Sequence, residues 1–146
     1  MLTKDRVLGI VVLLATLSAL VVADQPHMRA ARTDLQQARA QLQAARANKG
    51  GHRVKAIEHV NAAIAYVNSG IDFDRRHNHA HSLLNDAFNT SADPDQPHMQ
   101  AALELLRQAK SSLENASSDK GGYRKRAIDE VNDAIDETKK GIEAGE

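Results

Sequence analysis

Apolar residues recur along this chain with the alternating three- and four-residue spacing of an amphipathic helix. Met28 is followed every seventh residue by Leu35 and Leu42, and an alanine stands between each of these positions and the next. A heptad pattern of this kind predicts a helix whose apolar stripe packs against another helix. The pattern recurs farther along the chain, at Met99, Ala102, Leu106, Ala109, Leu113 and Ala116.

The pair Gly50–Gly51 lies at the centre of a mirrored arrangement of small residues. The flanking positions are Ala45, Ala38 and Ala31 before the pair, and Ala56, Ala63 and Gly70 after it. A chain that folds back at the glycines would bring these positions face to face, which is typical of an antiparallel helical hairpin. We expect a left-handed glycine at this turn, because glycine adopts that conformation without a Cβ penalty. The pair Gly121–Gly122 is flanked in the same way.

The two patterned stretches are copies of one unit. Residues 24–71 align with residues 95–142 without a gap, and 24 of the 48 aligned positions are identical. The sequence therefore predicts an all-α fold in which two antiparallel helical hairpins, 24–71 and 95–146, form a four-helix bundle after an internal duplication.

Residues 72–94 connect the two hairpins and are rich in histidine and aspartate. Helical spacing of Phe73, His77 and Leu84 predicts a short amphipathic helix from about Arg75 to Phe88, with Asp74 as its N-cap. The pattern leaves open whether this helix continues the preceding one. Because the connector joins the end of one hairpin to the start of the next, we expect it at the end of the bundle opposite the two glycine turns.

The first 23 residues have the pattern of a secretory signal peptide. Lys4 and Arg6 precede an apolar run over residues 7–22, and Ala23 offers a small residue for cleavage. We therefore expect a periplasmic or secreted protein that begins at Asp24 and is not attached to a membrane after cleavage. The chain has no cysteine, which excludes thiol chemistry, cysteine-based zinc sites and covalent haem attachment.

The histidines are the candidates for binding chemistry. His77 and His81 lie one helical turn apart in the predicted connector helix, a spacing that lets two imidazoles bind one metal ion, and Asp74 extends the same side. His27 and His98 open the two hairpins, and we expect both at the end of the bundle where the connector lies. These five residues predict a site for copper, nickel or zinc, since imidazole suits all three metals.

His52 and His59 are expected on the outward side of the second helix as ordinary surface residues. The simplest alternative to a metal site is that the other histidines also only cap helices or hydrate a polar linker.

Other function classes find little support in the sequence. The Glu-x-x-His motif of di-iron bundles is missing and no nucleophile motif is present, so we expect no enzyme. Residues 24–71 carry seven Lys/Arg against three Asp/Glu, whereas residues 95–146 carry eight against eleven. These net charges, +4 and −3, favour packing of the two hairpins on each other and give no basis for nucleic-acid binding.

The motifs Gln-Pro-His-Met, Lys-Gly-Gly followed by His or Tyr and then Arg, and Ala-Ile occur in both hairpins. In these motifs the chain resembles small uncharacterised exported bacterial proteins with the same hairpin, over residues 24–77 and 95–142. The resemblance implies export and a helical hairpin fold. Besides metal binding, two hypotheses stay open: an envelope structural or interaction protein that docks a partner through Phe73, Leu84 and Phe88, and a homodimer in which two copies exchange hairpins.

Overall fold

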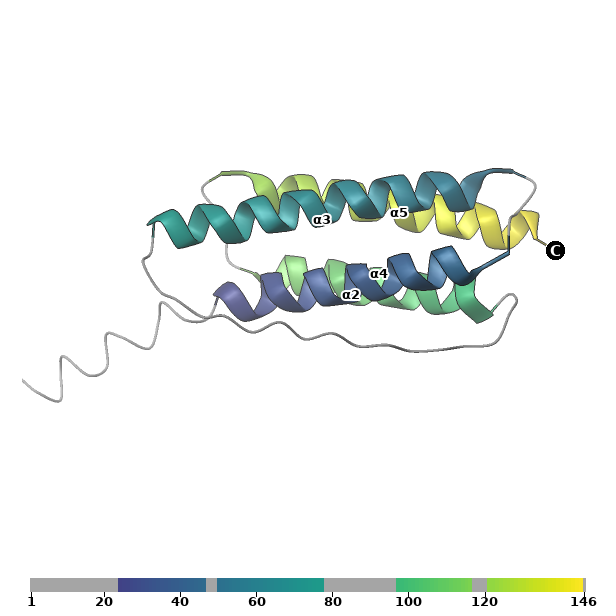
Figure 1. Ribbon diagram of the computed structural model, residues 1–146, viewed down its shortest axis with the longest axis horizontal. Helices are drawn as coiled ribbons and strands as arrows, with labels where there is room; N and C mark the ends of the chain where they lie inside the picture. The colour runs from purple at the N-terminus through teal and green to yellow at the C-terminus, as the bar shows by residue number, and fades with distance from the viewer. Residues whose placement is uncertain (1–23, 47–49, 78–96, 117–120, 146) are drawn as a thin grey trace, which may run out of the picture.

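Four antiparallel helices form the bundle that the heptad patterns predict (Figure 1). The computed structural model describes residues 24–46, 50–77, 97–116 and 121–145. The first hairpin consists of α2 (Asp24–Ala44) and α3 (His52–His77), and the second of α4 (Pro97–Asn115) and α5 (Tyr123–Ala144). The predicted all-α fold is confirmed.

The heptad positions form the core. Leu35, Leu42, Leu106 and Leu113 are fully buried, and so is every alanine of the mirrored patterns apart from slight exposure at the helix ends. On α3 and α5 the inward-facing positions are of two kinds. Val60, Val67, Val131 and Thr138 are among those that are buried, whereas Ile57, Ile64, Ile128 and Ile142 are partly buried at the edge of the core. Alternation of alanine with leucine or valine lets the helix backbones approach closely while the larger side chains fill the layers between.

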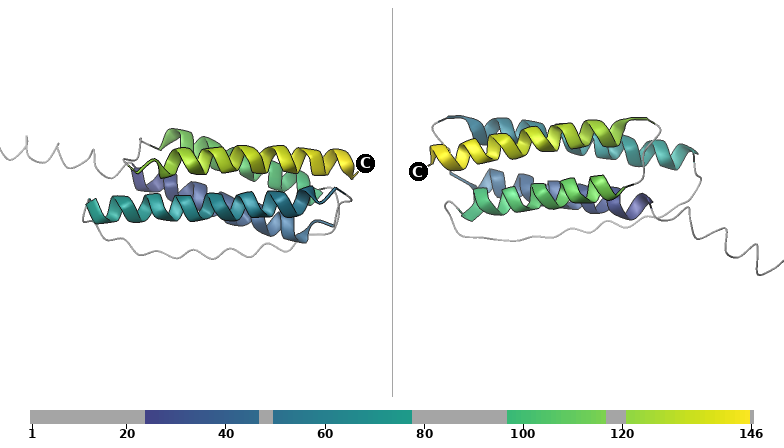
Figure 2. Two further views of the ribbon diagram at one scale, coloured as in Figure 1. Left: turned by 90° about the horizontal axis from the view of Figure 1, so that it is seen from above. Right: turned by 180° about the vertical axis from the view of Figure 1, so that it is seen from behind.

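The helices pair most extensively between the hairpins and less so within them: α3 packs on α5, and α2 packs on α4. Figure 2 shows both pairs side by side and antiparallel. The two hairpins are therefore related by a local two-fold axis, and the two glycine turns lie at opposite ends of the bundle. The expectation that both turns share one end is wrong, because an antiparallel duplicate reverses the second hairpin.

A second difference concerns the end of α3. This helix runs through Gly70 to His77, so Asp74 lies inside the helix and is not an N-cap. The helix continues because its apolar face continues: Gly70 and Ile71 are buried, and the Phe73 ring lies 6.3 Å from the Tyr123 ring of α5. The predicted connector helix beyond His77 lies outside the described residues.

Each glycine turn is built in the same way. Gly51 and Gly122 have φ values of +69° and +70°, which confirms the expected left-handed glycine at the turn. Two residues later, Arg53 donates hydrogen bonds from Nη1 to the carbonyls of Leu42, Gln43 and Ala45 at 3.1–3.3 Å. Arg124 does the same to Leu113, Glu114 and Ala116. The repeated arginine thus satisfies the last carbonyls of the preceding helix, where a positive charge also offsets the helix dipole.

The buried Thr138 is a position at which the cores of the two hairpins differ in polarity. Its hydroxyl donates to the Ala134 carbonyl one turn earlier at 2.7 Å, and Val67 holds the equivalent position in the first hairpin. We predict that Thr138→Val raises the melting temperature by a few degrees, because a buried hydroxyl is replaced by a methyl group of the same shape, a gain of up to about 1 kcal/mol. The reciprocal control, Val67→Thr, should lower it. A drop in the melting temperature of Thr138→Val would contradict this account of the core.

Candidate functional site

The two histidines that open the hairpins lie in different environments. His98 is 3% exposed, and its Nδ1 lies 2.6 Å from Oε1 of Gln41 near the end of α2. Because an amide oxygen only accepts, Nδ1 of His98 donates this hydrogen bond. His27 is exposed, since the residue equivalent to Gln41 in the second hairpin is Ser112, whose side chain is shorter. His98 thus has a structural role that the sequence pattern did not indicate.

The five residues predicted to hold a metal are not all brought together. His27 lies at the start of α2 and His77 at the end of α3, which share one end of the bundle, whereas His98 lies at the opposite end (Figure 1). The prediction of a metal site that joins His98 to His27 or His77 is therefore wrong, because these residues lie at opposite ends of the bundle. Asp74 is half-buried on α3, and His81 and the side chain of His77 lie outside the described residues.

A different histidine faces carboxylates at the seam between α3 and α5. Nδ1 of His59 lies 2.8 Å from Oε2 of Glu130, with side-chain exposures of 34% and 27%. Glu130 holds in the second hairpin the position that His59 holds in the first, so this pair lies close to the local two-fold axis. An ionised carboxylate only accepts hydrogen bonds, so the proton of this contact is carried by Nδ1 of His59.

Asp133 completes a group with these two residues. It follows Glu130 by one turn on α5, and a ring nitrogen of His59 and one oxygen of each carboxylate all lie within 4.8 Å of one another. Within the described ranges this is the one group of three such side chains with that spacing. Imidazole nitrogen and carboxylate oxygen are the ligands that zinc and other divalent transition metals take in open, three-residue sites.

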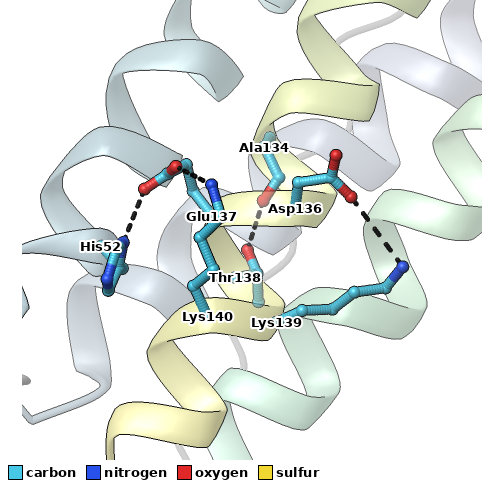
Figure 3. Close-up of polar contacts among 7 residues, drawn as sticks. All are labelled: His52, Ala134, Asp136, Glu137, Thr138, Lys139 and Lys140. Carbon is cyan, nitrogen blue, oxygen red and sulfur yellow. Dashed lines mark hydrogen bonds and ion pairs between the residues drawn. The ribbon is translucent and has the colours of Figure 1, made fainter.

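Two helical turns before His59 on α3, a second histidine contacts a carboxylate across the same seam (Figure 3). Nδ1 of His52 lies 2.8 Å from Oε2 of Glu137, and the Lys140 ammonium donates to Oε1 of Glu137 at 2.8 Å. Hydrogen bonds from Lys140 and then His52, together with the charges of Lys140 and Lys55, lower the pKa of Glu137 from 4.5 to about 2. The carboxylate of Glu137 therefore remains ionised through the acid range in which an ordinary glutamate is protonated.

The local two-fold axis relates this polar cluster to an aromatic one. Tyr123 replaces His52, and Tyr66 replaces Glu137. Arg126 replaces Lys55, and its guanidinium carbon lies 5.9 Å from the Tyr66 ring centroid and 6.0 Å from that of Tyr123. The two ends of the seam thus differ in chemistry: one holds an ionic group that could bind a ligand, and the other holds a cation between two aromatic rings.

The expectation that His52 and His59 are ordinary surface residues is wrong, since both are half-buried and bonded across the seam. The sequence contains one indication of this contact: His59 and Glu130 hold equivalent positions in the two repeats. In two copies of a hairpin paired about a two-fold axis, a residue near the axis meets its own counterpart. That signal is readable only once the antiparallel pairing of α3 with α5 is known.

No known protein family, curated protein or solved structure matches this chain. Among the helices that the structure describes, none combines the length and the apolar character required to cross a membrane.

Glu137 gives the seam a testable dependence on pH. In the unfolded chain this carboxyl titrates near its ordinary pKa of 4.5, whereas in the bundle its pKa is about 2. Its contribution to stability is therefore complete above pH 4.5 and disappears as the pH falls to 2. We predict that Glu137→Gln lowers the melting temperature above pH 4.5 and that the difference from wild type shrinks between pH 4.5 and 2.

The matched control is Glu143→Gln, an exposed glutamate on the same helix. It should leave the pH profile of the melting temperature parallel to that of wild type. If the difference in melting temperature between Glu137→Gln and wild type stays constant from pH 6 to about pH 2, then hydrogen bonds from Lys140 and His52 do not lower the pKa of Glu137.

Proposed function

We propose that this is an exported helical-bundle protein that binds a divalent transition metal ion at the seam between its two hairpins. The observation that supports this most directly is the convergence of His59, Glu130 and Asp133 from two helices, with their ligand atoms within 4.8 Å of one another. The histidine pattern predicts a metal site formed by the connector and the hairpin starts. We propose the same kind of ligand chemistry at a different place, the seam between α3 and α5. It assigns no enzymatic reaction.

The three side chains provide one nitrogen and two oxygen ligands. A tetrahedral ion such as zinc would then have one position left for water or for a further ligand. Binding through Nδ1 of His59 requires the ring proton to move from the contact with Glu130 to Nε2. Because an imidazolium cannot coordinate a metal ion, binding weakens as the pH falls. By the general order of affinities, copper binds more tightly than nickel or zinc to ligands of this kind.

The seam also holds the ligands in place before a metal arrives. His59 and Glu130 are each about one-third exposed and come from helices whose backbones are fixed by a fully buried core. Sites on such helices are more precisely positioned than sites on loops. Partial exposure leaves a path for the ion from solvent, so the group is both pre-organised and accessible.

The alternative hypothesis, an interaction protein that docks a partner through an apolar face, finds less support in the described residues. Phe73, one of its three anchors, is half-buried and packs against Tyr123 within the bundle. Val54 is the one large apolar side chain that is exposed in the described part of the chain. Leu84 and Phe88 lie outside the described residues, so the alternative depends on the connector alone.

Export is the second part of the proposal. It is supported by the basic start, the apolar run over residues 7–22 and the small residues before Asp24. An exported protein meets metal ions before they are bound by intracellular proteins, which suits a small binding protein with an open site.

Metal titration of the chain from Asp24 onward tests the proposed site. We predict binding of copper, nickel or zinc in calorimetry, and His59→Ala should weaken it at least about tenfold, since one of three ligands is lost. His52→Ala is the matched control: it removes a half-buried histidine from the same helix whose partner, Glu137, is outside the group, and it should leave the affinity unchanged.

The double variant His77→Ala/His81→Ala distinguishes the two metal hypotheses. It should bind metal as wild type does if the seam is the site. Loss of binding in the double variant with normal binding by His59→Ala would place the metal at the connector instead. If the wild-type chain binds none of the three metals, the proposed function is wrong.

A further inference from the structure

The contact between His59 and Glu130 divides the α3–α5 seam into two halves, which the local two-fold axis relates. The first half contains the third metal ligand, Asp133, and leads to the ionic cluster around Glu137. The second half leads to the aromatic cluster around Arg126. Because equivalent residues are 71 positions apart in the sequence, the two halves can be compared residue by residue.

The two halves differ in their acidic residues. In the first half the charge of Lys55 contributes to the low pKa of Glu137, so this cation lies near an ionised carboxylate. Arg126 is the counterpart of Lys55 in the second half, where it has no acidic residue of this kind beside it. The two acids of the first half have uncharged counterparts in the second: Tyr66 for Glu137, and Ala62 for Asp133.

Arg126 is exposed, and its guanidinium lies over the rings of Tyr66 and Tyr123. In the part of the chain that the structure describes, Arg126 forms no ion pair. Glu130, one turn later on α5, is bonded to His59. A guanidinium can contact aromatic rings and still donate two N–H groups to a carboxylate, because its donors point outward in its plane. Arg126 is therefore available to bind an anion.

The second half is also the side on which the proposed metal ion has no protein ligand. Asp133 supplies a carboxylate on one side of the His59–Glu130 contact. Its counterpart on the other side, Ala62, ends in a methyl group and is partly exposed. A tetrahedral ion bound by three residues keeps one position for an external ligand. Arg126 precedes Glu130 by one turn, about 6 Å along α5, so a ligand beside Ala62 lies between the ion and this arginine.

The charges indicate which kind of ligand fits this place. A divalent ion bound by Glu130 and Asp133 is neutral overall, so Arg126 supplies the positive charge on the Ala62 side. An organic carboxylate balances that charge, whereas a phosphate dianion leaves an excess of negative charge. One carboxylate oxygen can bind the ion while the other accepts hydrogen bonds from the guanidinium. The partly exposed ring of Tyr66 offers a surface to the apolar part of the ligand.

We propose that the metal-loaded protein binds a small organic carboxylate between the open position of the ion and Arg126, with its apolar part against Tyr66. This inference rests on the proposed function, because the ion supplies one of the two contacts of the carboxylate. Binding of metal and binding of carboxylate are then coupled, and each raises the affinity for the other by the same factor.

Calorimetric titration with benzoate tests the inference. The mature chain is loaded with zinc, or with copper or nickel if zinc does not bind, in a buffer that contains no other carboxylate. We expect the metal-free chain to bind benzoate at least about tenfold more weakly than the metal-loaded chain, since one contact is missing. Arg126→Gln should also weaken benzoate binding at least about tenfold, because the charged hydrogen bonds are lost.

Two further variants make the test specific. Lys55→Gln is the matched control, because it removes the counterpart of Arg126 on the side of Asp133, and it should leave the affinity for benzoate unchanged. Ala62→Asp places a carboxylate at the position equivalent to Asp133. It should bind metal more tightly than wild type and lose the binding of benzoate, since its own side chain takes the open position.

The metal affinity separates this inference from the proposed function. Arg126→Gln should bind metal as wild type does when benzoate is absent, which also shows that the bundle is intact. If wild type binds metal but benzoate does not bind, or binds equally well to Arg126→Gln or to Ala62→Asp, the inference is overturned and the proposed function stands. If wild type binds none of the three metals, both are wrong.

Discussion

The antiparallel pairing of two copies of one hairpin is the constraint on which the rest of this structure depends. Alanine at every seventh position lets the helices approach closely, and the leucines and valines between them are buried. Because the copies are related by a two-fold axis, residues near that axis meet their own counterparts. Substitution of one counterpart and not the other then creates contacts between unlike residues, such as His59 with Glu130.

This arrangement explains why the two ends of the α3–α5 seam differ although the hairpins share half of their residues. The core positions are kept in both copies, since a change of volume in a close-packed core is destabilising. The seam positions lie at the edge of the core and accept a change of chemistry. One end has become the ionic cluster of His52, Glu137 and Lys140, and the other has become the aromatic cluster of Tyr66, Tyr123 and Arg126.

The sequence was sufficient to predict the helices, the turns and most of the core. Mirrored alanines and heptad leucines are local patterns, and a glycine pair between them leaves one way to fold back. The relative direction of the two hairpins is not a local property: a parallel and an antiparallel pair would bury the same residues. For that reason the sequence pattern places His98 at the wrong end of the bundle, and it wrongly places the end of α3 and the start of α4 together.

The candidate site could not be predicted for the same reason. His77 and His81 are close in the sequence, so their one-turn spacing can be recognised without a structure. His59 and Glu130 are 71 residues apart, and no local pattern links them. Only the direction of the hairpins brings that pair together. The repeated arginine shows the converse case, since Arg53 and Arg124 act within their own hairpins and their conserved place after each glycine pair was visible from the start.

The distance between the starts of the two hairpins tests the antiparallel pairing most directly. The chain has no cysteine, so spin labels can be attached to single cysteines placed at positions 27 and 100, near the starts of α2 and α4, without other changes. Measurement should be made on labelled chains diluted with unlabelled ones. The antiparallel account predicts a label separation of about 20 Å by pulsed electron resonance, because the Gln41–His98 contact places position 100 beside Arg39, twelve residues along α2 from position 27. A separation of about 10 Å or less, the distance between two packed helix axes and the value expected if both hairpins start at the same end, would contradict it.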